Sequence, residues 1–221
     1  MIRVGVAGAV GRMGVAVCGA IAAADDLELS ARADPLLGVS LAEVLGDCDV
    51  VVDFTQPDVA LPNALACLDA GVHVVIGTTG FDVSALEGVR GANAFVAPNF
   101  AIGAVLMMRF AAEAARHMAA AEIIELHHDG KIDAPSGTAA RTAELMAAAS
   151  GRAAPPIHSV RLPGLVAHQE VILGDLGQTL TIRHDSLERS SFMPGVLLAV
   201  RRVGSLDRSP VVGLEHLLFE D

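Results

Sequence analysis

Residues 122–139 read EIIELHHDGKIDAPSGTA and concentrate side chains that can exchange protons or hold anions. Within this stretch, Lys131 is the only lysine among the 15 Lys and Arg residues of the chain. Arginine keeps its proton in proteins, whereas a partly buried lysine can release one. A lone lysine in the densest polar cluster therefore indicates a proton donor. A leftover surface lysine is the plainer alternative.

Two adjacent histidines precede this lysine. Residues 121–128 contain two adjacent β-branched isoleucines followed by Leu126, which predicts a strand that Gly130 breaks. Successive side chains of a strand point to opposite faces, so His127 and His128 cannot perform the same task. We expect one imidazole to face a pocket and the other to approach from its rim.

A helix start follows the lysine. Pro135 and Ser136 predict a helix that continues to about Ala149, with Ser136 as its N-cap. The first-turn amides of residues 137–139 would then be free to bind an anion such as a carboxylate. Two imidazoles, one amine and an anion-binding turn suit a small acidic substrate that must be protonated.

The same stretch allows two other interpretations. Glu125, His127 and Asp129 would share a strand face and could hold a metal ion, but no cysteine lies nearby and no HExxH spacing occurs. Ser136 could act as a nucleophile, but PSGT lacks the GxSxG pattern of a nucleophile elbow. We therefore expect no metal and no serine nucleophile.

Composition limits the function classes. The chain is 52% hydrophobic with mean hydropathy +0.52, yet no uninterrupted apolar run reaches the ~18–20 residues of a membrane span. The net charge of −11 disfavours nucleic acid as a partner. The first residues, MIRVGVAG, predict a strand and carry no secretory signal pattern. Cys18, Cys48 and Cys67 show no CxxC spacing, so we expect free thiols and a cytoplasmic location.

A glycine turn follows the first predicted strand. Residues 2–7 alternate valine with small residues, and Gly8, Gly11 and Gly14 follow in GxxGxxG spacing before an alanine-rich helix to about Ala24. Strand, glycine turn and helix are typical of a dinucleotide-binding fold. Gly8 permits the tight turn, Gly11 brings the backbone near a pyrophosphate, and Gly14 allows close helix–strand packing.

An acidic residue stands where the adenosine ribose would bind. A second predicted strand, residues 27–33, ends at Asp34, which lies 20 residues past Gly14. Such a carboxylate accepts hydrogen bonds from ribose hydroxyls and favours NADH, whereas Arg12 could hold the 2′-phosphate of NADPH. We expect both cofactors to bind, with NADH slightly preferred.

Predicted strands and helices then alternate, which indicates an α/β fold with a Rossmann-type doubly wound parallel sheet. The expected elements are a helix at 40–45, a strand at 49–54, a helix to about 70, a strand at 72–76, a helix at 84–89 and a strand at 94–97. The pattern changes near residue 101 to a second, α+β domain. Its expected elements are a helix to about 119, the strand and helix of the opening stretch, and strands at 157–162, 168–173 and 178–184. Helices at 190–203 and 213–219 complete the prediction.

The sequence closely resembles the 4-hydroxy-tetrahydrodipicolinate reductase family. The resemblance runs nearly end to end and rests on GAVGRMG at 8–14, DFT at 53–55, GTTGF at 77–81, APNF at 97–100 and ELHHDGKIDAPSGTA at 125–139. It implies hydride transfer from NADH or NADPH to a cyclic dicarboxylate in lysine and diaminopimelate synthesis. It also implies a dinucleotide-binding domain at 1–101 plus 192–221, a substrate-binding and oligomerisation domain at 102–191, and a homotetramer.

The resemblance implies a role for each matching residue. His127 and Lys131 would be catalytic, with Lys131 as proton donor and His127 as proton donor or acceptor. His128, Ser136, Gly137 and Thr138 would bind substrate carboxylates. The cofactor residues would be Gly8, Ala9, Val10, Gly11, Arg12, Met13, Asp34, Gly77, Thr78, Thr79, Ala97, Pro98, Asn99 and Phe100. Two alternatives remain from the residues alone: another NAD(P)-dependent reductase of a small imine or keto acid, and a non-catalytic NAD(P) sensor.

Overall fold

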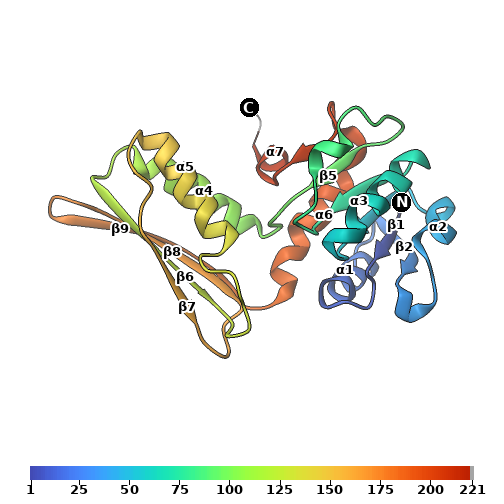
Figure 1. The fold of residues 1–221 in the computed structure, drawn as a ribbon, viewed down its shortest axis with the longest axis horizontal. Helices are drawn as coiled ribbons and strands as arrows, with labels where there is room; N and C mark the ends of the chain where they lie inside the picture. Colours follow the sequence, from blue (N-terminus) through green and yellow to red (C-terminus); the bar gives the residue numbers. More distant parts are fainter. Residues whose placement is uncertain (220–221) are drawn as a thin grey trace. The chain divides into compact units, whose positions relative to one another are not determined.

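The protein is described by a computed structural model that covers residues 1–219 (Figure 1). It divides into two compact units. Unit 1 comprises residues 1–100 together with the segment that begins at Phe192, and unit 2 comprises residues 101–191. Each unit has its own sheet and its own hydrophobic core.

Unit 1 contains a six-stranded sheet in which every neighbouring pair is parallel. The strands are β1 (Ile2–Ala7), β2 (Leu27–Ala33), β3 (Val50–Asp53), β4 (His73–Ile76), β5 (Ala94–Val96) and β10 (Val211–Val212), in the order β10-β5-β4-β3-β1-β2. The predicted parallel sheet is confirmed. Strand β10 was not predicted, because two residues are too few to show a periodicity.

The central strands of this sheet are buried on both faces. Val4, Val6, Val52 and Val75 are all fully buried, as expected where helices cover both faces of a parallel sheet. The helices of unit 1 are α1 (Arg12–Ala22), α2 (Leu41–Val44), α3 (Pro57–Asp69), α6 (Met193–Arg202) and α7 (Glu215–Leu218).

One predicted helix of unit 1 is wrong. Residues 84–89 do not form an α-helix; a single 3-10 turn, Val83–Leu86, stands there instead. Asp82 caps this turn through the amide of Ser84, and Gly88 follows with a left-handed φ of 76°. A left-handed glycine so close to the start ends the helix before a second turn can form.

The last part of the chain completes unit 1. Helix α6 packs against α1, and Arg201 forms a two-pronged ion pair with Asp26 at 2.7 and 2.8 Å. Strand β10 extends the sheet beside β5. Helix α6 begins at Met193, after a 3-10 turn at Arg189–Phe192, slightly later than predicted.

Unit 2 is a mixed four-stranded sheet with two helices on one face (Figure 1). Its strands, in sheet order, are β7 (Ile157–Arg161), β6 (Ala120–His127), β8 (Ala167–Asp175) and β9 (Gln178–Ser186), and its helices are α4 (Ile102–Ala115) and α5 (Gly137–Ser150). Ile123, Met146, Val171 and Leu173 form the core between sheet and helices. The predicted α+β architecture is therefore confirmed.

Helix α4 ends at Ala115, four residues earlier than predicted. The guanidinium of Arg152 donates hydrogen bonds to the backbone oxygens of Ala115 and Met118, so a distant side chain satisfies carbonyls at this helix end.

Among residues 1–219, no helix combines the length and the apolar character that crossing a bilayer requires. All three cysteines are buried and free.

Candidate active site

The predicted cofactor residues of unit 1 lie at one edge of its parallel sheet. Residues 8–13 follow β1, Asp34 follows β2, residues 77–79 follow β4, and residues 97–100 follow β5. Because these strands are parallel neighbours in one sheet, their carboxyl ends meet at the same edge. Ligands of open parallel sheets bind outside this edge.

The glycine turn requires glycine at two positions. Gly8 has a φ of 76°, and a Cβ there would lie 2.5 Å from the backbone oxygen of Phe54. A Cβ on Gly14 would lie 2.0 Å from the backbone oxygen of Gly8, so the predicted close packing of helix on strand is confirmed. The turn also contains a hydrogen bond from the Gly11 amide to the Gly8 oxygen at 3.0 Å.

Asp34 borders a cavity of about 470 Å³ beside the glycine turn. Its two carboxylate oxygens accept hydrogen bonds from the amides of Val10 at 3.2 Å and Leu36 at 3.0 Å. Each oxygen keeps a further lone pair that could accept a hydrogen bond from a ribose hydroxyl. Glu43 also lines the cavity, so two carboxylates, those of Asp34 and Glu43, disfavour an added phosphate there.

Asp53 organises the same sheet edge, and the sequence analysis did not assign it a role. Its fully buried carboxylate accepts hydrogen bonds from the amide and hydroxyl of Thr55 at 3.0 and 2.7 Å, from the hydroxyl of Thr78 at 3.1 Å and from the amide group of Asn63 at 2.8 Å. It therefore ties the loops after β3 and β4 together. The sequence contained one signal for this role: Asp53 ends a strand, and the loops after this strand and the next one both contain threonine.

The phenylalanines of this edge form a compact support. A Cβ on Gly77 would lie 2.0 Å from the ring of Phe54, so only glycine lets the loop after β4 pass this ring. The rings of Phe54 and Phe100 pack with centroids 5.8 Å apart. The loops after β4 and β5 therefore both pack against the ring of Phe54.

In unit 2, His127 is held by a buried carboxylate. Its Nδ1 lies 2.5 Å from Oε2 of Glu125, which is two residues earlier on the same face of β6 and is fully buried. Arg161 on β7 forms a two-pronged ion pair with Glu125 at 2.9 and 2.7 Å. The Ser136 amide donates to the same carboxylate at 3.2 Å.

These contacts set the charge states of the cluster. Burial alone would raise the pKa of Glu125, but hydrogen bonds from Arg161, Ser159 and His127 outweigh burial and bring this pKa to about 2. Burial lowers the pKa of His127, the Glu125 carboxylate opposes this effect, and the charges of Lys131 and Arg161 add to the lowering. The cluster therefore contains an ionised Glu125 beside an imidazole that titrates below its usual pH.

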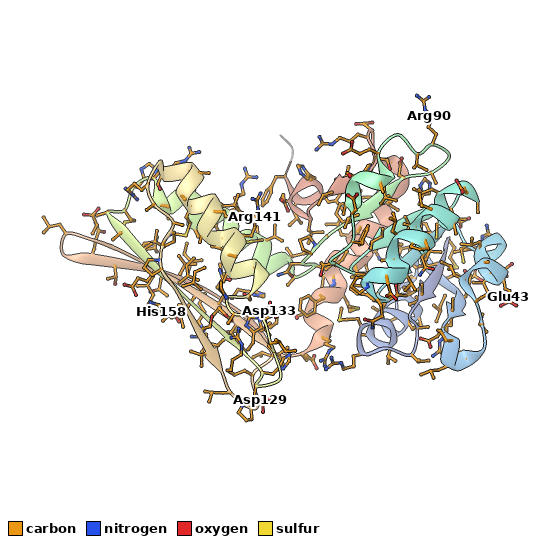
Figure 2. The ribbon with its side chains drawn as sticks, in the orientation of Figure 1. Glu43, Arg90, Asp129, Asp133, Arg141 and His158 are labelled. Atoms are coloured by element: carbon orange, nitrogen blue, oxygen red, sulfur yellow. The ribbon has the colours of Figure 1, made fainter. Side chains whose placement is uncertain are left out.

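Lys131 follows a short turn after β6. The turn is closed by a hydrogen bond from the Lys131 amide to the His128 oxygen at 3.1 Å. The side chain of Lys131 is 21% exposed, and its ammonium forms an ion pair with Asp133 at 2.7 Å. Figure 2 shows Asp129 at the far end of this turn and Asp133 nearer to the start of α5. Lys131 is thus partly buried, in the loop that links His127 to α5.

The start of α5 differs in one respect from the prediction. Ser136 is the N-cap, as expected, and its hydroxyl accepts the Ala139 amide at 3.2 Å. The Ala139 amide is therefore engaged within the helix, and the expectation that it is free to bind an anion is wrong. Gly137 is exposed, and Thr138 is half-buried beside it.

The remaining predicted residue, His128, is half-buried and lies just past the end of β6. Its ring lies close to Gly130, where a Cβ would meet the imidazole at 3.4 Å.

Within residues 1–219, no three His, Cys, Asp or Glu side chains gather as a metal ion would require. The sequence analysis missed Arg161, because a residue 36 positions away from Glu125 gives no local signal.

The fold and these residues define a class. Unit 1 is a Rossmann-type domain with a glycine turn and a carboxylate after β2 that borders a cavity, and unit 2 carries an amine and two imidazoles next to a helix start. This combination is typical of NAD(P)-dependent oxidoreductases.

The chain belongs to the dihydrodipicolinate reductase family. The family model for the N-terminus of dihydrodipicolinate reductase matches residues 2–100, and the model for its C-terminus matches residues 103–218. These matches confirm the family resemblance found in the sequence.

Individual relatives agree. The chain is 52% identical to the 4-hydroxy-tetrahydrodipicolinate reductase of Nocardia farcinica, with 98% of each chain covered, and 51% identical to that of Thermobifida fusca, with 99% of each covered. A solved structure of dipicolinate-bound dihydrodipicolinate reductase from Paenisporosarcina sp. TG-14 matches with a TM-score of 0.86 and 38% identity, covering 98% of this chain and 99% of that one. A probable dehydrogenase from Thermotoga maritima, at 13% identity and a TM-score of 0.61, shares the fold.

Proposed function

We propose that the protein reduces 4-hydroxy-tetrahydrodipicolinate to tetrahydrodipicolinate, with loss of water, in lysine and diaminopimelate biosynthesis. NADH or NADPH, when bound, supplies the hydride. The family membership supports this reaction. The observation that carries the proposal is the cluster in which Glu125 holds His127 on β6 and the loop after β6 presents Lys131.

The residues of unit 1 bind and orient the nicotinamide cofactor in this proposal. The turn at residues 8–13 holds the pyrophosphate, and Asp34 accepts the ribose hydroxyls. The loops at 77–79 and 97–100, supported by Asp53 and Phe54, border the nicotinamide. The glycines that no side chain could replace and the cavity beside Asp34 support this assignment.

Lys131 and His127 move the proton. Lys131, as an ammonium, donates a proton to the substrate ring as the hydride arrives, and His127 assists by exchanging a proton at Nε2. Each group can contribute about 10²–10⁴-fold by general acid–base action. The partial burial of Lys131 and the lowered pKa of His127 support these roles.

The substrate carboxylates bind at the start of α5 and at His128. Gly137 is exposed and lets an anion approach the backbone, with Thr138 beside it. Ser136, which is only 3% exposed, contributes by capping the helix. A doubly charged substrate also meets the positive charge of Lys131, which an acidic protein must supply locally.

A spectrophotometric assay tests the function. The purified protein is given 4-hydroxy-tetrahydrodipicolinate with NADH and, in parallel, with NADPH, and the loss of reduced-nicotinamide absorbance is followed. Turnover with both cofactors is expected. Turnover only with other imines or keto acids would identify a different reductase, and cofactor binding without any turnover would identify a nucleotide sensor.

The protein is further proposed to act as a cytoplasmic homotetramer built through the sheet of unit 2. Helices α4 and α5 cover one face of this sheet, so the other face carries half-buried Ile124, Leu126 and Ile172 in the absence of a partner. Sedimentation analysis tests this, with a tetramer expected for the native protein and smaller species for Ile124→Lys. The free, buried thiols suit a reducing compartment.

A further inference from the structure

Glu125 has two carboxylate oxygens with different partners. Oε1 receives hydrogen bonds from Arg161 Nη2 at 2.7 Å and from the Ser136 amide at 3.2 Å, both of which can only donate. Oε2 receives Arg161 Nη1 at 2.9 Å and faces Nδ1 of His127. An ionised carboxylate can only accept, so Nδ1 of His127 must carry the proton of this contact.

We propose that Glu125, fixed by Arg161, is the positioning residue that keeps the proton of His127 on Nδ1 and so leaves Nε2 as the ring atom that exchanges protons with the substrate. The proposal rests on the function proposed above. The second partner of the carboxylate, the Ser136 amide, couples the orientation of His127 to the start of α5, where substrate carboxylates bind. One buried group therefore aligns both halves of the substrate site in unit 2.

The charged surroundings of His127 agree with this role. Glu125 faces it from its own strand, Arg161 contributes from β7, and Lys131 contributes from the following loop. Arg161 also donates to the backbone oxygens of Val160 and Asp133, so the guanidinium is anchored independently of the carboxylate. The pKa of Glu125, about 2, keeps it ionised at neutral pH.

Glu125→Gln makes a sharp test, because an amide has only one oxygen. Two obligate donors face the Oε1 position and one, Arg161 Nη1, faces the Oε2 position, so we expect the amide oxygen at Oε1 and the NH₂ group toward His127. Nδ1 then has to accept, and the proton of the neutral imidazole moves to Nε2. We expect nitrogen-15 NMR of the ligand-free protein to show this inverted tautomer, with the His127 signals assigned by their loss in His127→Asn.

Kinetics provide the second measurement. We expect kcat to fall by about 10²–10⁴-fold with KM changed little, as when a catalytic histidine is held in the wrong tautomer. Glu125→Asp keeps an acceptor-only group and should retain the wild-type tautomer and lose less activity. Glu144→Gln, which alters an exposed Glu–Arg pair with Arg141, is the matched control and should change neither quantity.

The single glutamine variant leaves the Arg161 guanidinium without the Glu125 carboxylate, so the double variant Glu125→Gln/Arg161→Met is made alongside it as a check on folding. The Ser136 amide still directs the oxygen, and the same inverted tautomer is expected. A folded variant that keeps the proton on Nδ1, or retains wild-type kcat, would overturn the positioning role. Absence of turnover by the wild-type protein would instead remove the proposed function and leave the NMR result intact.

Discussion

The ammonium of Lys131 lies 2.7 and 2.8 Å from the two carboxylate oxygens of Asp133, so the proposed proton donor is already paired within its own loop. Asp133 is 61% exposed, and exposed ion pairs contribute only about 0–1 kcal/mol. A substrate carboxylate can therefore replace Asp133 at little cost. The pair orients the amine until substrate arrives.

Asp133→Asn should lower the KM for the dicarboxylate by about two- to tenfold, because it removes a competing charge that also repels the substrate. We expect kcat to change little. Steady-state kinetics at saturating NADH measure both quantities. Asp129→Asn, in the adjacent turn, is the control for general charge effects; an equal drop in KM there would refute the competition between Asp133 and substrate.

Lys131→Arg should lower kcat by about 10²–10⁴-fold, because arginine keeps the positive charge but does not release a proton. Substrate affinity should be largely retained. Rapid-reaction kinetics for the chemical step and equilibrium titration with a dicarboxylate analogue check the two expectations. A variant with near wild-type kcat would exclude lysine from proton transfer.

Glu125 should contribute to acid sensitivity. Its pKa is lowered from 4.5 to about 2 in the folded protein, so its stabilising effect is complete above pH 4.5 and is lost as the pH falls toward 2. Between pH 6 and pH 3.5 this contribution should fall by about 1–2 kcal/mol. Urea unfolding at both pH values measures it, with Glu125→Gln showing a correspondingly smaller change. Equal pH dependence in the two proteins would contradict the lowered pKa.

Asp53→Ala should destabilise unit 1 by about 2–4 kcal/mol and weaken NADH binding, because it leaves the buried or partly buried donors of Thr55, Thr78 and Asn63 without their acceptor. Denaturant unfolding and NADH titration measure the two effects. Asp69→Ala, at the exposed end of α3, serves as the control and should behave as wild type. Unchanged cofactor affinity in a folded Asp53→Ala protein would mean that the loops do not depend on this carboxylate.

Asp34→Asn should shift cofactor preference toward NADPH by about tenfold, which corresponds to about 1.4 kcal/mol. The change removes a negative charge that would repel a 2′-phosphate and replaces a strong acceptor for the ribose hydroxyls. Separate kcat/KM values for NADH and NADPH give the ratio. An unchanged ratio would show that the adenosine ribose lies away from Asp34.

The features that the sequence predicted correctly depend on neighbours in the chain. The bounds of β1 and β2 and the Ser136 N-cap follow from side-chain alternation and capping within a few residues. The need for Gly8 and Gly14 follows from the tight strand-to-helix turn. Such local rules, together with the family motifs, also identified the fold class.

The features that the sequence did not predict depend mostly on contacts between distant segments. Arg161 reaches Glu125 only because β7 pairs with β6 in a particular register. Arg152, which follows α5 in the chain, donates hydrogen bonds to carbonyls at the end of α4. Residues 211–212 form a strand only because they pair with β5. The Ala139 amide is a local exception: an N-cap serine accepts the amide three residues further on, so this amide is not free for an anion.

The joining of residues 1–100 with the segment after Phe192 has a consequence for biosynthesis on the ribosome. The first hundred residues leave the exit tunnel without α6 to cover α1 and without β10 to cover the edge of β5. Apolar surface of the nascent nucleotide domain therefore stays uncovered until unit 2 has been translated. Unit 2 can fold during this time. Cells that make this protein have reason to shield its earliest segment with a chaperone.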